Sequence, residues 1–114
     1  MAGLIENVYV NRFIIGGTST IMAKSVNASH ILVGSEKDAL NIKARLDKGE
    51  DFAALAKRFS KCPSKSKGGN LGWFGKGEMV PEFENAAFSA NKGDIVGPVR
   101  TEFGYHIILI KDVK

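Results

Sequence analysis

Residues 104–113, GYHIILIKDV, form the most strand-like stretch of this 114-residue sequence. Successive side chains of a β-strand point to opposite faces of its sheet. Both sets are apolar here: Tyr105, Ile107 and Leu109 alternate with His106, Ile108 and Ile110. A strand that is apolar on both faces belongs in the interior of a sheet. The stretch therefore predicts a central strand, and its two neighbouring strands must come from other parts of the sequence.

Three further stretches supply candidate neighbours. Residues 27–33, NASHILV, are rich in aliphatic and β-branched side chains between an asparagine and a glycine, which predicts a strand. Residues 94–99, DIVGPV, predict a short strand, and Pro98 indicates a sheet edge or a strand end. Residues 60–83 are rich in Ser, Pro, Lys and Gly and should be mostly loop, with NLGWF at 70–74 as a short strand inside it.

Helices are predicted between these strands. Ser35 is a good N-cap for a helix that Gly49 ends. A second helix begins at about Asp51, and a third begins at Pro81 and ends near Gly93. The first two carry core-facing apolar stripes, made of Ala39, Ile42 and Leu46 and of Phe52, Leu55, Ala56 and Phe59. This order of elements predicts an α+β domain with a small antiparallel sheet.

Composition limits the classes of protein. The length fits one domain with a modest core. There are 16 Lys and Arg against 12 Asp and Glu, and this net charge of +4 favours anionic partners without requiring one. A single cysteine, Cys62, excludes an internal disulfide framework. It fits a reducing compartment, and a secreted protein without disulfides has the same composition; we expect a cytoplasmic protein. No stretch approaches the roughly 20 apolar residues that span a bilayer.

Residues 1–22 differ from the rest of the chain. They contain one acid and one base, lack the cationic start of a signal peptide, and end in GGTST before Met22. We interpret them as an extension outside a domain of residues 23–114. A loose, disordered tail, an extra edge strand through VYVNRFII, and a start-site artefact with Met22 as the natural beginning all fit this composition.

Both histidines, His30 and His106, lie in predicted strands, and a histidine in such a strand is most often a buried structural residue. Zinc would need three or four ligands, and these residues lack the usual short-spaced pairs. A Cys–His hydrolase using Cys62 would need a nucleophile motif that is absent, although Lys61 and Lys65 could lower the thiol pKa. A site that cleaves no bond and needs no cofactor is the remaining option.

Four segments together resemble the parvulins, one of the families of peptidyl-prolyl cis/trans isomerase. They are SHILV, DFAALAKRFS, CPSKSKGGNLGWFGKGEMVPEFENAAF and GPVRTEFGYHIILI. The pattern G-G-x-L-G-x-F-x-x-G-x-M-x-x-x-F at 68–83 and FGYHII at 103–108 match in order and spacing. The resemblance implies a four-stranded antiparallel sheet flanked by about four helices, with the first and last strands as central neighbours.

The resemblance also implies roles for individual residues. The two strand histidines would hydrogen-bond to each other, with hydroxyl groups of Ser29 and Thr101 beside them, and Cys62 would occupy the position of a family Cys or Asp. The predicted catalytic group is therefore His30, Cys62, His106, Thr101 and Ser29. The predicted proline pocket is formed by Leu71, Met79 and Phe83, with Phe74 as a supporting wall and Phe103 at its border.

The implied activity is isomerisation of X–Pro bonds in peptides and unfolded protein clients by a monomer. The phosphate-directed branch of the family carries a long basic loop after the first strand, whereas this chain has only GSEKD there. We therefore expect no preference for phosphoserine. The alternative is a proline-peptide binding module, or a holdase chaperone, in which turnover is incidental.

A group of cations lies between the second predicted helix and the glycine-rich motif. It consists of Lys57, Arg58, Lys61, Lys65 and Lys67. Such a run is usually a solvated surface, but it could make weak contacts with nucleic acid or an anionic membrane surface. A binding titration at two salt concentrations distinguishes the two interpretations.

Overall fold

A four-stranded antiparallel sheet forms the centre of the computed structural model, which describes residues 24–114. The strands are β1 (Ser25–Val33), β2 (Asn70–Gly75), β3 (Ile95–Thr101) and β4 (Gly104–Val113), in the spatial order β2-β1-β4-β3. The predicted α+β class is confirmed, and β4 is a central strand paired with β1, as its two apolar faces indicated. The predicted extension, residues 1–22, lies outside the described residues.

The helices are α2 (Glu36–Asp47), α3 (Phe52–Phe59), the 3-10 helix η3 (Pro63–Lys67) and α4 (Pro81–Phe88). Ser35 caps α2 as predicted, because its Oγ accepts a hydrogen bond from the Asp38 N–H at 3.2 Å. Asp51 caps α3 in the same way, accepting from the Ala54 N–H at 2.9 Å. No helix of residues 24–114 has the length and apolar character needed to cross a membrane.

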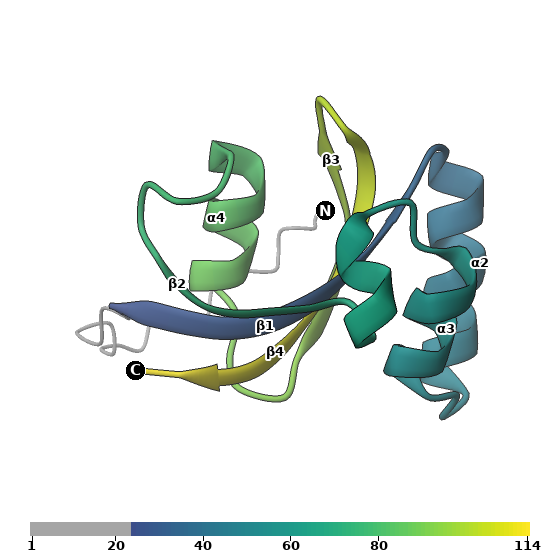
Figure 1. The fold of residues 1–114 in the computed structure, drawn as a ribbon, viewed down its shortest axis with the longest axis horizontal. Helices are drawn as coiled ribbons and strands as arrows, with labels where there is room; N and C mark the ends of the chain where they lie inside the picture. Colours follow the sequence, from purple (N-terminus) through teal and green to yellow (C-terminus); the bar gives the residue numbers. More distant parts are fainter. Residues whose placement is uncertain (1–23) are drawn as a thin grey trace, which may run out of the picture.

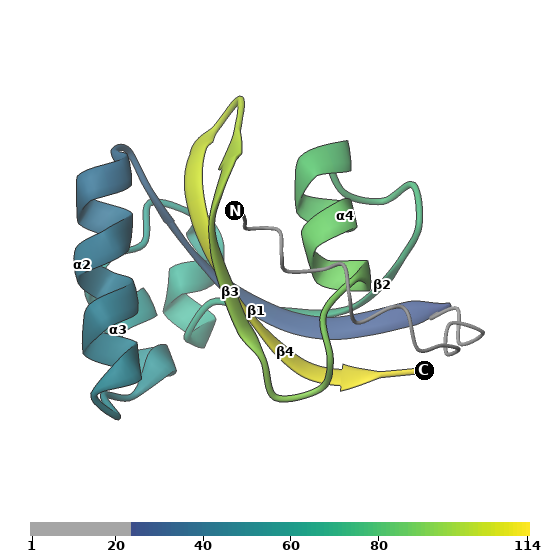
Figure 2. The ribbon, with the colours of Figure 1, turned by 180° about the vertical axis from the view of Figure 1, so that it is seen from behind.

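The helices cover opposite faces of the sheet (Figures 1 and 2), with α2 and α3 on one face and α4 on the other. Each face has its own core cluster. The first contains Ile31, Val33, Ala39, Ile42, Leu46, Phe52, Leu55, Ala56 and Ile107. The second contains Val26, Ala28, Phe74, Phe83, Ala87, Ile108 and Ile110. The alternation of neighbouring residues in β1 and β4 thus divides their side chains between two separate cores.

Two local features differ from the expectation. The predicted third helix ends at Phe88, several residues before Gly93. Beyond it, the Asp94 carboxylate accepts a hydrogen bond from the Asn91 N–H at 2.8 Å and holds the chain in a turn that leads into β3. The segment before the glycine-rich motif was expected to be loop, yet it contains η3, which begins at Pro63. The resemblance implied about four helices, and the described residues form three α-helices and this 3-10 helix.

Candidate active site at the paired histidines

The pairing register of β1 and β4 brings the two histidines together. His30 lies opposite Ile108, and Leu32 lies opposite His106, so the histidines are diagonal neighbours on one face of the sheet. Diagonal pairs are still within reach of aromatic side chains. The His30 and His106 rings stack with centroids 5.1 Å apart and planes at 17°, although 76 residues separate them in sequence.

A chain of hydrogen bonds connects the pair to the hairpin between β3 and β4. The two Nδ1 atoms are 3.0 Å apart, and Nε2 of His106 lies 2.7 Å from Oγ1 of Thr101. The same Thr101 oxygen accepts a hydrogen bond from the Phe103 N–H at 3.1 Å. The predicted contact between the two histidines is therefore present, and Thr101 is beside it. Val99 lies opposite His106 on β3, so Thr101, two residues further, shares that face.

The hydrogen-bond count indicates which tautomers the histidines adopt. If the Thr101 hydroxyl donates to Nε2 of His106, then Nδ1–H of His106 donates to Nδ1 of His30. The proton of His30 is then on Nε2, a buried atom without a hydrogen-bond partner among residues 24–114. In the alternative arrangement, Nδ1–H of His30 donates to His106 and Nε2–H of His106 donates to Thr101. That arrangement would leave both Nε2 of His30 and the hydroxyl proton of Thr101 without a partner. We therefore assign the Nδ1–H form to His106 and the Nε2–H form to His30.

Both histidines are neutral at physiological pH. Their side chains are almost fully buried, with His30 5% and His106 4% exposed. Desolvation by burial, together with the neighbouring His106, lowers the pKa of His30 to about 4. Desolvation also lowers the pKa of His106 to about 4. A short contact between two ring nitrogens requires one of them to lack its proton. The geometry of the pair and its burial therefore both indicate uncharged histidines.

This burial predicts a specific dependence of stability on pH. An unfolded histidine has a pKa of about 6.5, so between roughly pH 6.5 and pH 4 the unfolded chain binds more protons than the native one. The free energy of unfolding should therefore be highest above this pH window and should decrease as the pH is lowered through it. Two shifts of about 2.5 pKa units, at about 1.4 kcal/mol per unit, together correspond to a loss of up to about 7 kcal/mol over the full window.

Urea unfolding followed from about pH 7.5 to about pH 4.5 would measure this loss. His30→Gln carries one titrating group fewer, so its unfolding free energy should depend less steeply on pH. Equal slopes for the two proteins across the window would contradict the shared, desolvated site.

Aromatic and apolar side chains cover the histidines. Phe83 on α4 is 3% exposed, and its ring meets His30 edge-on at 5.5 Å and His106 at 5.3 Å. Phe74 on β2 packs against Phe83 at 5.9 Å between ring centroids. Leu71 and Met79 are partly buried against the same core cluster. The described residues therefore place a water-poor apolar surface directly beside the histidines.

The remaining predicted residues lie further from the hydrogen-bonded chain. Ser29 is buried, but it precedes His30 on the strand and so points to the other face, and no hydrogen bond joins its hydroxyl to either histidine within residues 24–114. Cys62 is a half-buried free thiol immediately before η3. Phe103 is 62% exposed at the tip of the β3–β4 hairpin. The roles assigned to these three residues stay predictions.

Ser60 and Gly69 support the site and were missed in the sequence. Ser60 is buried, and its Oγ accepts hydrogen bonds from the N–H groups of Leu32 at 3.0 Å and Cys62 at 3.3 Å. Gly69 O accepts from the His30 N–H at 2.9 Å. A Cβ on Gly69, where φ is +86°, would lie 2.4 Å from the main-chain oxygen of His30. The double glycine was visible in the sequence, but the strand it approaches was not.

Comparison with known proteins agrees with this geometry. The family model described as "Rotamase: PPIC-type PPIASE domain" matches residues 21–112. The foldase protein PrsA of Geobacillus kaustophilus is 57% identical over 88 residues, which cover 76% of this chain and 31% of that protein. PrsA of Caldanaerobacter subterraneus is 58% identical over 84 residues, 73% of this chain and 28% of the relative. The chain thus spans about a third of the length of these relatives.

Solved structures show the same fold. The crystal structure of PrsA from Bacillus anthracis superposes with a TM-score of 0.79 at 47% identity, covering 82% of this chain and 43% of that one. NmPin, the parvulin of Nitrosopumilus maritimus, superposes with a TM-score of 0.72 at 46% identity, over 78% of this chain and 97% of that one. With a family match over most of its length, this chain belongs to the PPIC-type rotamases, the parvulin family of peptidyl-prolyl isomerases.

Proposed function

We propose that this domain accelerates cis/trans isomerisation of X–Pro peptide bonds in polypeptide substrates. The observation that carries the proposal is the neutral, hydrogen-bonded pair of histidines beneath Phe83. The partly buried side chains of Leu71 and Met79 pack against the core cluster that contains Phe83. Membership of the rotamase family supports the same activity.

The reaction requires no bond to be cleaved. An X–Pro bond rotates over a barrier of about 18–20 kcal/mol because twisting it removes the amide resonance. The planar amide is the more polar form, so a dry pocket that grips the proline ring disfavours it relative to the twisted state. Phe83, Met79 and Leu71 supply apolar surface for that grip. The histidine pair supplies a rigid polar floor beneath this apolar surface. Because both rings stay uncharged, they do not draw water into the site.

Substrate selection should not depend on phosphate. Only Gly34 and Ser35 lie between the end of β1 and the first residue of α2, so no long basic loop is present at this point of the fold. Relatives named foldases suggest that unfolded protein segments containing proline are the natural substrates, and we extend that suggestion to this domain.

A protease-coupled assay on short X–Pro peptides tests the activity directly. We expect kcat/KM to be flat from about pH 6 to pH 8, since neither histidine changes its charge there, and to fall as the histidines gain protons at lower pH. Rates equal to the uncatalysed background would refute the isomerase and leave a proline-binding module or holdase.

Cys62→Ser should retain substantial activity. A serine keeps the approximate size and hydrogen-bonding capacity of cysteine but removes a good nucleophile. Within residues 24–114 no side-chain hydrogen bond connects the Cys62 thiol to the histidines, whereas Cys62 N–H is held by Ser60. We expect kcat/KM to fall by less than about tenfold, whereas covalent catalysis would make the loss of the thiol fatal. A folded but inactive Cys62→Ser protein would contradict a non-covalent mechanism.

Three broader expectations stay predictions. The basic residues Lys57, Arg58, Lys61, Lys65 and Lys67 are all exposed, as weak contacts with nucleic acid or an anionic surface would require. The half-buried free thiol of Cys62 is compatible with the expected reducing, cytoplasmic compartment. The expected monomer can be checked by sedimentation of the purified chain.

A further inference from the structure

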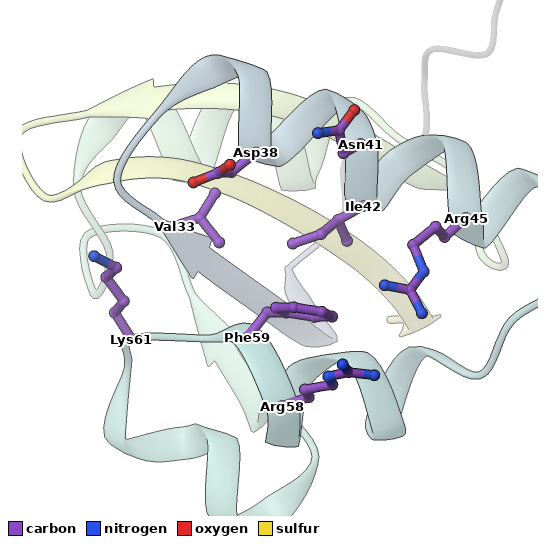
Figure 3. A pocket seen from close by; sticks show the side chains of 8 residues that line it. All are labelled: Val33, Asp38, Asn41, Ile42, Arg45, Arg58, Phe59 and Lys61. Carbon is purple, nitrogen blue, oxygen red and sulfur yellow. The ribbon is translucent and has the colours of Figure 1, made fainter.

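A cleft between α2 and α3 lies on the face of the sheet opposite the histidines, and it has a volume of about 490 Å³. Its floor is formed by Val33 at the end of β1, Ile42 of α2 and Phe59 of α3 (Figure 3). Val33 and Ile42 are buried members of the first core cluster, and Phe59 is partly buried against it. The volume is within the usual range for ligand sites, about 300–1,000 Å³.

Charged and polar side chains line the two sides of this α2–α3 cleft. Asp38, Asn41 and Arg45 project from α2, while Arg58 and Lys61 lie on the side of α3 and the segment after it (Figure 3). Arg45 is already engaged, since its Nε and Nη2 groups donate to the Glu50 carboxylate at 3.0 and 2.9 Å. Arg58 and Lys61 have no ion pair within residues 24–114.

The two guanidinium groups are held against the cleft floor. Those of Arg45 and Arg58 lie 5.3 and 5.0 Å from the centroid of the Phe59 ring. Such stacking limits the freedom of an arginine side chain while leaving its N–H groups available as donors. Lys61 is placed by its own backbone, because its N–H donates to Leu32 O at 2.7 Å. The cleft therefore presents partly ordered cations beside an apolar floor.

We propose that the α2–α3 cleft binds an acidic polypeptide segment in which an aromatic or aliphatic residue lies next to Asp or Glu. The apolar side chain would cover Val33, Ile42 and Phe59, and the carboxylate would pair with Arg58 and Lys61. On the opposite side, the Asp38 carboxylate can accept hydrogen bonds from a peptide backbone, and the Asn41 amide can both donate and accept them. A polyanion such as nucleic acid fits less well, because its phosphates would run along the whole cleft past the Asp38 carboxylate, whereas a single Asp or Glu can pair with Arg58 and Lys61 on the side away from it.

This site is independent of the isomerase site, so its test needs no turnover. The probe is the proline-free peptide DFELD, acetylated and amidated, with the neutral peptide NFQLN as its control. In amide NMR titrations we expect DFELD to shift the signals of Val33, Ile42, Phe59 and Lys61 and to leave those of His30 and His106 unmoved. NFQLN should bind much more weakly, and added salt should weaken DFELD binding because these charges are partly exposed.

Arg58→Gln should weaken DFELD binding roughly tenfold, the factor expected for loss of one charge-assisted hydrogen bond. Lys37→Gln is the matched control, since Lys37 is an exposed residue of α2 that does not line the cleft. The amide spectrum of each free variant shows whether it remains folded. Equal weakening by both substitutions would overturn the proposal in favour of general charge attraction. Shifts confined to the histidine face, or equal binding of NFQLN, would overturn it as well.

Discussion

The double variant Met79→Ala with Phe83→Ala should lose nearly all isomerase activity. Full burial of one large apolar side chain is worth about 1.5–3 kcal/mol, and a tenfold change in rate corresponds to about 1.4 kcal/mol, so loss of both should lower kcat/KM by roughly a hundredfold or more. Phe83 contributes twice, because its ring also shields His30 and His106 from water. Its loss should therefore raise the pKa of both histidines toward the ordinary value.

Stability has to be separated from activity in this experiment. Phe83 is 3% exposed in the second core cluster, so Phe83→Ala alone should cost about 3–5 kcal/mol of unfolding free energy. Phe88→Ala is a matched control, because Phe88 packs against Phe74 in the same cluster without a ring contact to either histidine among the described residues. Phe83→Leu, which keeps much of the apolar volume, provides a more stable second variant.

Activity is measured as kcat/KM at a temperature where circular dichroism shows each variant to be folded. We expect Phe88→Ala to stay active and the double variant to be inactive while folded. A folded double variant with most of the parent activity would show that the substrate proline binds elsewhere on the domain.

Gly69→Ala should be among the most destabilising single substitutions in this domain. An added Cβ would overlap the main-chain oxygen of His30 at 2.4 Å and crowd the Ala56 Cβ at 3.2 Å. The oxygen belongs to a central strand that cannot move without breaking its pairing with β4. We expect a loss of more than about 3 kcal/mol, in the range that marks steric disruption of a packed interior.

Gly72→Ala isolates the contribution of backbone conformation. Its φ is +73°, close to the +86° of Gly69, but a Cβ there meets nothing within 4 Å. The control should therefore cost only about 1–2 kcal/mol, the usual penalty for a left-handed residue with a side chain. Urea unfolding of both variants measures the difference. Similar losses would show that conformation alone, rather than the close approach to His30, requires glycine at position 69.

The local structure of this protein follows from its sequence. Ser35 caps α2 through a hydrogen bond to a residue three positions away, and the apolar stripe of Ala39, Ile42 and Leu46 follows the helical repeat. The central position of β4 follows from the apolar residues on both its faces. These features depend on neighbours within a few residues, so periodicity and capping preferences are sufficient to predict them. The helix predicted to end near Gly93 instead ends at Phe88, and a turn held by Asp94 follows it before β3.

Only the tertiary structure determined the geometry of the site. The residues alone favoured two separate buried histidines, and the contact between them was expected from family resemblance. The contact depends on a register in which His30 lies opposite Ile108 and Leu32 opposite His106, and that register contains an irregularity between Asn27 and Ala28. A shift of one residue would move the histidine of the slipped strand to the other face of the sheet.

The supporting role of Gly69, the ordering of Ser60 and the α2–α3 cleft were likewise decided by the tertiary structure. Gly69 packs closely against His30 of β1, almost 40 positions earlier in the chain. The Ser60 hydroxyl accepts a hydrogen bond from the N–H of Leu32, 28 positions away. Sequence patterns record which side chains prefer to be buried and where helices begin. They do not record which buried groups meet, because those distances depend on strand register and on the packing of helices against both faces of the sheet.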